Sequence, residues 1–385
     1  MSMSEEKRLL IVVDDDPANI RLANSILCDD YDIRGATNGV KALSLLHSAP
    51  MPDLILLDVM MPAPDGYDVC RSLKANPQTR DIPVIFLTGQ TQEEQETQGF
   101  EVGAVDYIHK PFSAPVLKAR VRTHIMLREA RELLSRQLAA INYELEMARE
   151  IQLSNLPRDT PKLEGLEIAA RYIPTSVLAG DFYDFVCIDE KHLGILIADV
   201  SGHGLPAALI ASMLKVALSA QSAHAFDPAQ VLAGLNQSLC GKFRSHFVTA
   251  AYLFVDLEKN IVVYAGAGHP PLLLWCNRER MAREFVNNGL ILGPFAEASY
   301  SSIEFDFEAG DRLCLYTDGV PEFKSPAGEQ FGEDRLRQFM EANHGLRADQ
   351  FVENLTAQLW KWAEKNPGVA PLDDITILAI DLLSR

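Results

Sequence analysis

A long stretch without glycine divides this chain of 385 residues into two parts. Between residues 113 and 152 the only proline is Pro115, near the start, and apolar side chains recur in steps of three and four residues. This spacing predicts one long amphipathic helix. The chain is long enough for two or three domains, so we expect the helix, placed at residues 113–156, to connect a domain at residues 1–122 with one at residues 158–385.

The apolar positions of the predicted helix form a nearly regular heptad seam, in which the step between Leu134 and Leu138 breaks the alternation. One interpretation is a helix packed on its own domain. The other is a parallel coiled coil between two chains, which would make the protein a homodimer. The seam consists of Leu127, Ala130, Leu134, Leu138, Ile141, Leu145 and Ala148.

The region before the helix alternates apolar runs with amphipathic segments. The runs read "RLLIVV", "YDIRGA", "DLILLD", "PVIFLT" and "VDYIHK". Nearly continuous apolar strands are typical of a parallel sheet that is covered on both faces. We therefore predict a doubly wound α/β domain with a five-stranded parallel sheet.

Polar residues stand at the ends of four of these predicted strands. Asp14 and Asp15 follow the first, Asp58 ends the third, Thr88 ends the fourth and Lys110 ends the fifth. One aspartate after a strand is commonly a turn or a helix cap, but strand ends of a parallel sheet meet at one edge. The three aspartates would hold Mg²⁺ there, with Asp58 accepting a phosphoryl group whose oxygens pair with Lys110 and Thr88.

This arrangement resembles the receiver domain of two-component response regulators, over about residues 7–122. The resemblance implies that a sensor histidine kinase is the partner that leads to phosphorylation of Asp58. It also implies a switch formed by Thr88 and by Tyr107, which occupies the position of an aromatic residue that turns inward on phosphorylation.

Beyond Pro161 the pattern becomes antiparallel. The runs "FYDFVCI" and "HLGILIADV" form a predicted hairpin centred on Glu190, which places Asp181 almost opposite Asp199. Asp318 in "LYTDG" and Asp373 in "LDDITIL" also stand at strand ends. A cluster with only oxygen ligands favours Mg²⁺ or Mn²⁺ over zinc.

Three residues of "ADVSGHG" are candidates for the chemistry. Ser201 would be a nucleophile, but the surrounding sequence is not the G-x-S-x-G motif. His203 would be a metal ligand or general acid, although a residue between two glycines more commonly shapes a turn. Asp199 is the favoured candidate, as a metal ligand together with Asp181.

The second region resembles the PPM class of metal-dependent serine/threonine protein phosphatases, in the bacterial branch typified by RsbU and SpoIIE. Ala179 and Pro321 depart from the usual pattern at positions that are not expected metal ligands. The matching motifs are "EMAREIQLSNLP", "GDFYD", "DVSGHGLPAAL", "GAGHPPLLL", "LYTDG", "FGEDRL" and "DDITIL".

The phosphatase resemblance implies an α-β-β-α sandwich with two Mn²⁺ or Mg²⁺ ions at one end. The metals would activate a water molecule that attacks phosphorus, without a covalent phosphoenzyme. Asp374 is left open, because a supporting role is as compatible with its position as direct ligation. The implied metal ligands are Asp181, Asp199, the Val200 carbonyl, Asp318 and Asp373.

Together these features predict a phosphatase gated by its receiver. By resemblance, its substrate is an anti-sigma-factor antagonist of the STAS type. The alternative is a non-catalytic adaptor that binds a sigma or anti-sigma factor according to phosphorylation of Asp58. A formal net charge of −18 opposes nucleic acid or an anionic membrane as partners. Six scattered cysteines and the lack of a signal pattern or a long apolar run favour a cytoplasmic location.

Overall fold

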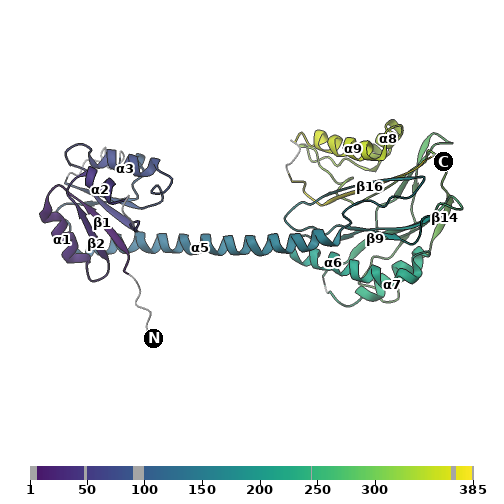
Figure 1. The fold of residues 1–385 in the computed structure, drawn as a ribbon, viewed down its shortest axis with the longest axis horizontal. Helices are drawn as coiled ribbons and strands as arrows, with labels where there is room; N and C mark the ends of the chain where they lie inside the picture. The colour runs from purple at the N-terminus through teal and green to yellow at the C-terminus, as the bar shows by residue number, and fades with distance from the viewer. Residues whose placement is uncertain (1–6, 47–49, 90–98, 244, 366–369, 384–385) are drawn as a thin grey trace. The chain divides into compact units, whose positions relative to one another are not determined.

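The computed structural model describes residues 7–46, 50–89, 99–243, 245–365 and 370–383, and it divides into two compact units (Figure 1). The first unit spans Met1–Ile141 and the second spans Asn142–Arg385. The division falls within one helix, α5, which runs from Ala114 to Asn155.

The first unit contains a five-stranded parallel sheet in the order β2-β1-β3-β4-β5. This order and the alternation with helices confirm the predicted doubly wound α/β domain. The strands are β1 (Leu9–Val13), β2 (Asp32–Ala36), β3 (Leu54–Asp58), β4 (Val84–Thr88) and β5 (Asp106–His109), and the helices before α5 are α1 (Pro17–Leu27), α2 (Gly39–Leu45) and α3 (Gly66–Ala75).

Both faces of the central strands are buried, which explains their continuous apolar sequences. On β1, Ile11 and Val13 belong to one hydrophobic cluster, whereas Leu10 and Val12 belong to another on the opposite face. Successive side chains of a strand point to opposite faces, so each cluster takes every second residue. Because both faces of these strands are covered, a polar side chain can reach solvent only at the strand ends, where the polar residues stand.

Helix α5 begins as part of the first unit. Leu117, Val121 and Ile125 are buried in a hydrophobic cluster with β1 and β3, and the Arg128 guanidinium donates hydrogen bonds to the carbonyl oxygens of Pro52 and Asp53. Beyond these turns the predicted apolar seam is exposed as far as Ile141, with exposed fractions between 52% and 65% at Leu127, Leu134, Leu138 and Ile141, and half-buried at Leu145 and Ala148.

The second unit contains two mainly antiparallel sheets. One has the order β13-β10-β9-β8-β7, with β14 paired to β10, and the other has the order β12-β11-β15-β16-β6. Their strands are β6 (Leu166–Ile173), β7 (Phe182–Cys187), β8 (His192–Val200), β9 (Val248–Asp256), β10 (Ile261–Ala267), β11 (Leu272–Cys276), β12 (Met281–Phe285), β13 (Asn288–Gly289), β14 (Ile303–Asp306), β15 (Arg312–Tyr316) and β16 (Ile375–Leu382).

Helices cover the outer face of each sheet (Figure 1). On β15, Leu313 and Leu315 point into the core between the sheets, whereas Cys314 and Tyr316 point toward the helices on the outer face. This alternation confirms the predicted α-β-β-α sandwich. The helices α6 (Leu205–Ser219) and α7 (Pro228–Leu239) cover the first sheet, α8 (Glu333–Ala342) and α9 (Ala348–Trp362) cover the second, and a short 3₁₀ helix spans Ser222–His224.

Membrane-spanning helices are absent from the described part of the chain, since none of its helices has both the necessary length and the necessary apolar character.

Candidate functional site

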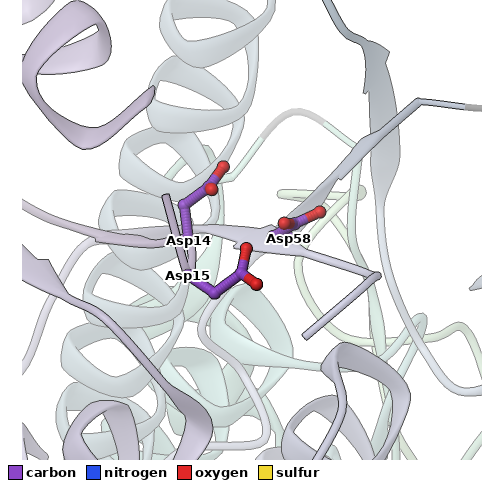
Figure 2. A group of neighbouring side chains, drawn as sticks. All are labelled: Asp14, Asp15 and Asp58. Carbon is purple, nitrogen blue, oxygen red and sulfur yellow. The ribbon is translucent and has the colours of Figure 1, made fainter. Parts of the chain in front are cut away.

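Three carboxylates meet at the carboxyl edge of the first unit's sheet (Figure 2). Asp14 and Asp15 follow β1, and Asp58 is the last residue of β3, the strand next to β1. One carboxylate oxygen of each residue lies within 4.8 Å of the others. Asp14 and Asp58 are buried, whereas Asp15 is exposed, so the group is open to a ligand from solvent on the Asp15 side.

The Lys110 ammonium joins the two buried carboxylates. Its Nζ lies 2.6 Å from Asp14 Oδ2 and 2.8 Å from Asp58 Oδ2. Burial raises the pKa of Asp58, and the hydrogen bond and charge of Lys110 oppose this increase. Burial works against the ammonium as well, but its two carboxylate partners outweigh that effect and raise the pKa of Lys110. The site therefore keeps a positive charge next to Asp58, where anionic phosphoryl oxygens would lie.

Thr88 and Tyr107 stand close to this edge in the sheet. Thr88 is buried at the end of β4, and its backbone carbonyl accepts a hydrogen bond of 2.7 Å from the Lys110 N–H. Tyr107 is half-buried on β5, with its ring 6.0 Å from that of Phe100 and with the Arg120 guanidinium 5.7 Å above it. Thr88 thus lies on the strand next to β3, and Tyr107 lies one strand further from Asp58.

In the second unit, the β7–β8 hairpin brings two aspartates together. The register pairs Phe182 with Ala198, so the next position outward places Asp181 opposite Asp199. A backbone hydrogen bond from Val200 to the Gly180 carbonyl continues the pairing. The sequence spacing therefore predicted this register correctly, because both residues are equally far from the turn.

Two threonine hydroxyls hold the Asp181 carboxylate in place. Asp181 Oδ2 accepts hydrogen bonds from Thr317 Oγ1 at 2.8 Å and from Thr376 Oγ1 at 2.6 Å. Thr317 is adjacent to Asp318, and Thr376 lies on β16, just after the aspartates of the "LDDITIL" motif. Sequence reasoning missed both threonines, although each stands inside a motif that it had singled out.

The aspartates around Asp181 repel one another. Burial, together with the charges of Asp318 and Asp373, raises the pKa of Asp199 to about 7, although a hydrogen bond with Asp181 opposes the increase. Burial and Asp373 likewise raise the pKa of Asp318 to about 6. Burial and the charge of Asp199 raise the pKa of Asp181 well above its ordinary value. These carboxylates therefore form one electrostatic cluster.

The two carboxylate clusters differ in spacing. Within the described residues, Asp14, Asp15 and Asp58 are the only group of three or more such side chains whose ligand atoms all lie within 4.8 Å of one another. The four aspartates of the second unit are therefore spread more widely. Two-metal sites hold their ions about 3.5–4 Å apart, and ligands on opposite sides of such a pair do not approach one another closely. A wider spacing is compatible with a pair of ions.

Asp374 uses both carboxylate oxygens to hold the loop before Asp181. Oδ1 accepts the Thr175 N–H at 2.7 Å, and Oδ2 accepts the Gly180 N–H at 2.6 Å. A Cβ atom at position 180 would lie 2.7 Å from the Val200 carbonyl oxygen, so only glycine fits there without displacement. Sequence reasoning left the role of Asp374 open, and these contacts favour a supporting one.

Ser201 and His203 have different surroundings from the aspartates. Ser201 Oγ accepts the Phe247 N–H at 2.9 Å, and its backbone carbonyl contacts His246 Nδ1 at 2.8 Å. These bonds hold the loop against the start of β9. His203 is exposed between its two glycines. This geometry favours a turn-forming role for both residues and supports Asp199 as the chemically important member of "ADVSGHG".

His269 is a buried residue of the "GAGHPPLLL" motif to which sequence reasoning assigned no role. Its Nδ1 forms a hydrogen bond of 3.0 Å with Thr249 Oγ1, and Thr249 pairs with Asp199 across the β8–β9 ladder. Burial lowers the pKa of His269 to about 3, so the ring is neutral at physiological pH. It supports the strand next to Asp199 without adding charge to the cluster.

Comparison with known protein families agrees with this geometry. Residues 189–383 match the family model described as Stage II sporulation protein E (SpoIIE), which is more than half of the chain. The chain belongs to the SpoIIE family. Residues 10–122 match the model of the response regulator receiver domain. The chain therefore combines a receiver with a phosphatase domain of the PPM type, as the sequence predicted.

Two curated relatives from Bacillus subtilis are similar to this SpoIIE-family chain. The phosphoserine phosphatase RsbU is 32% identical over 222 residues, covering 57% of this chain and 66% of RsbU. The phosphoserine phosphatase RsbP is 34% identical over 182 residues, covering 46% of this chain and 45% of RsbP. The chain thus spans less than two thirds of the length of either relative.

Among solved structures, the SiaA-PP2C domain of Pseudomonas aeruginosa has the same fold as the SpoIIE-family domain. The TM-score is 0.56 at 24% identity, and the match covers 64% of this chain and 98% of that structure. This similarity supports the architecture of the sandwich.

The raised pKa of Asp199 predicts a pH-dependent effect of its removal. The folded protein binds this proton more tightly than the unfolded chain does, so its stabilising contribution is complete below about pH 4 and is lost as the pH rises toward 7. In EDTA at pH 8, Asp199→Asn should raise the melting temperature of the second unit by at least about 2 °C. The difference should shrink toward pH 4 in calorimetric scans.

Asp189→Asn, on the turn of the same hairpin, is the matched control. A hydrogen bond from His192 lowers the pKa of Asp189, so removing this charge should not stabilise the unit at pH 8. An Asp199→Asn variant that melts at or below the wild-type temperature at pH 8 would contradict the prediction.

Proposed function

We propose that this chain is a response regulator in which phosphorylation of the receiver controls a metal-dependent serine/threonine phosphoprotein phosphatase. The observation that carries the proposal is the convergence of Asp181, Asp199, Asp318 and Asp373 from separate strands into one electrostatic cluster. The cluster lies in a chain that belongs to the SpoIIE family.

The residues of the cluster fit a pair of Mg²⁺ or Mn²⁺ ions. Their donors are all oxygens, which these ions prefer. Asp181, Asp199, Asp318 and Asp373 would hold the ions, with help from the Val200 carbonyl, which lies next to Gly180. When bound, such ions supply Lewis acidity and lower the pKa of water at the reaction centre.

The chain's own residues orient this site. Thr317 and Thr376 direct the Asp181 carboxylate, and Asp374 fixes the backbone of the loop that carries it. The exposed side chain of Asp373 leaves the cluster accessible from solvent. A phosphoseryl or phosphothreonyl side chain would approach from that side, while the buried Asp181 stays fixed below it.

In the receiver, Asp58 would accept the phosphoryl group from a sensor histidine kinase. Asp14 and Asp15 would hold Mg²⁺ together with Asp58, since the three carboxylates lie within 4.8 Å of one another. Lys110 would pair with the phosphoryl oxygens, and Thr88 and Tyr107 would change position in response.

The substrate we propose is a phosphorylated anti-sigma-factor antagonist of the STAS type, in the cytoplasm. The names of RsbU and RsbP as phosphoserine phosphatases support the chemical class. The adaptor alternative is less favoured, because a surface that only binds a partner does not need four clustered aspartates with unfavourable mutual repulsion.

Hydrolysis of p-nitrophenyl phosphate or a phosphoprotein should require Mn²⁺ or Mg²⁺. Asp199→Asn should reduce kcat by at least about 10²-fold, because Asp199 would hold the ions that lower the pKa of the attacking water. Ser201→Ala should retain most of the activity, since the Ser201 hydroxyl accepts a hydrogen bond from the backbone of Phe247, which holds the loop. Full activity in EDTA, or in Asp199→Asn, would exclude the metal mechanism.

Acetyl phosphate with Mg²⁺ should label Asp58 and no residue of the phosphatase domain. The reason is that Asp58 ends β3 beside Asp14 and Asp15, and the Lys110 ammonium lies 2.8 Å from its Oδ2, where it would pair with phosphoryl oxygens. Mass spectrometry after borohydride trapping identifies the labelled residue. Label that persists in Asp58→Asn would show that the acceptor is a different residue.

We further propose that α5 pairs with the same helix of a second chain, and that phosphorylation changes this pairing. Burying each aliphatic seam residue contributes roughly 1–2 kcal/mol. The association cost is about 4–15 kcal/mol, so pairing is favourable only if the seam residues of both chains are buried. The triple variant Leu134→Glu, Leu138→Glu and Ile141→Glu should therefore be monomeric in light scattering and unresponsive to acetyl phosphate.

The control for this variant carries three glutamates on the outer face of α5, at Ser135, Ala140 and Tyr143, which lie outside the seam and its flanking positions. It adds the same number of acidic residues but should stay dimeric. A wild-type protein that is monomeric at micromolar concentration in both phosphorylation states would refute the coiled coil.

A further inference from the structure

Helix α5 carries one buried side chain beyond its first turns, and that side chain is polar. From Met126 to Asn155 every residue of the helix is exposed or half-buried except Gln152, which is 6% exposed. Burial of an amide is unfavourable unless its donor and acceptor are both satisfied. Gln152 must therefore have a specific partner.

The partner of Gln152 is the backbone of Ala179. Gln152 Nε2 donates to the Ala179 carbonyl at 2.6 Å, and Gln152 Oε1 accepts the Ala179 N–H at 3.2 Å. Both polar groups of one peptide residue are thus held by one side chain. One hydrogen bond would leave Ala179 free to rotate about it. The two bonds from Gln152 fix both the position and the orientation of the Ala179 backbone.

Ala179 immediately precedes the segment that carries Asp181. The next residue, Gly180, donates its N–H to Asp374 Oδ2 at 2.6 Å, and Asp181 accepts hydrogen bonds from two threonines of the opposite sheet. The segment 179–181 is therefore held by the helix at one end and by β15 and β16 at the other. A shift at Gln152 would reach Asp181 through two peptide units.

Other contacts already dock this end of α5. Asn155 Nδ2 lies 3.2 Å from Ser212 Oγ on α6, and Leu156, just after the helix, is buried in the main hydrophobic core. Docking alone therefore does not require Gln152. Its two bonds are the contacts that connect the helix to the loop of the carboxylate cluster.

We infer that Gln152 is a positioning residue that holds Asp181 in the place needed to bind a divalent cation. The inference rests on the proposed function, because it takes Asp181 as a metal ligand. It also gives α5 a direct route to the cluster, since displacement of the last turns of the helix would release Ala179 and weaken cation binding.

The test is calorimetric titration of the full-length chain with Mn²⁺. Gln152→Met keeps the length of the side chain but removes both hydrogen bonds, and it should weaken Mn²⁺ binding by about tenfold, as removal of supporting hydrogen bonds around metal ligands commonly does. All variants carry Asp14→Asn and Asp58→Asn, so that the cluster of the first unit contributes little heat. The Mn²⁺ concentration for half-maximal hydrolysis of p-nitrophenyl phosphate should rise by the same factor.

Asn155→Ala is the matched control, because it removes a bond that docks the same helix end without touching the catalytic loop. It should lower the melting temperature slightly and leave Mn²⁺ binding unchanged. Gln152→Glu is a second variant in case Gln152→Met folds poorly. It keeps the acceptor for Ala179 N–H but loses the donor, and it should also weaken Mn²⁺ binding.

Folded Gln152 variants that bind Mn²⁺ as tightly as the wild type would overturn the inference and reduce Gln152 to a docking contact. The same holds if Asn155→Ala weakens binding equally. If Mn²⁺ binds and Gln152→Met weakens it, but no phosphate ester is hydrolysed, the positioning role stands and the proposed phosphatase activity fails.

Discussion

Repulsion between buried carboxylates is the constraint on which both candidate sites depend. Each site gathers aspartates at strand ends, where burial and neighbouring charges destabilise the ionised form. Such a group persists only if fixed hydrogen bonds or a positive charge hold it in place. In each unit, the residues around the aspartates supply that support.

The two units supply it differently. In the first, the Lys110 ammonium lies between Asp14 and Asp58 and compensates part of their charge. In the second, two threonine hydroxyls hold Asp181, and within the described residues no lysine or arginine forms an ion pair with the clustered aspartates. The first cluster is therefore partly balanced by a cation of its own chain, whereas the second is held by neutral hydroxyl donors. This difference suits the phosphoryl acceptor that we propose in the first unit and the pair of metal ions that we propose in the second.

Helix α5 has a different kind of contact in each unit. Its first turns pack by apolar side chains, as Leu117 and Val121 do, whereas its last turns contact the loop before Asp181 through the amide of Gln152. Apolar packing tolerates small adjustments, but a pair of hydrogen bonds is sensitive to distance and angle. A helix held in this way can stay attached to a unit while a small displacement alters the loop at its end.

The sequence by itself determined the local features of this protein. Apolar runs predicted the parallel sheet, and a long stretch without glycine, with apolar residues every three or four positions, predicted α5. Asp181 and Asp199 were placed opposite each other because they are equally far from one turn. These features depend on residues close together in the chain, where periodicity and turn geometry limit the possible structures. The four aspartates at strand ends were recognisable for the same reason.

Only the tertiary structure decided what supports those aspartates. Thr376 reaches Asp181 across 195 positions of sequence, Asp374 reaches Gly180 across 194, and Gln152 reaches Ala179 across 27. No periodic pattern encodes such pairs, because their distance depends on how the two sheets stack and where α5 ends. Hydrogen bonds act over about 3 Å, so the partners of a carboxylate are known only when the packing that brings them together is known.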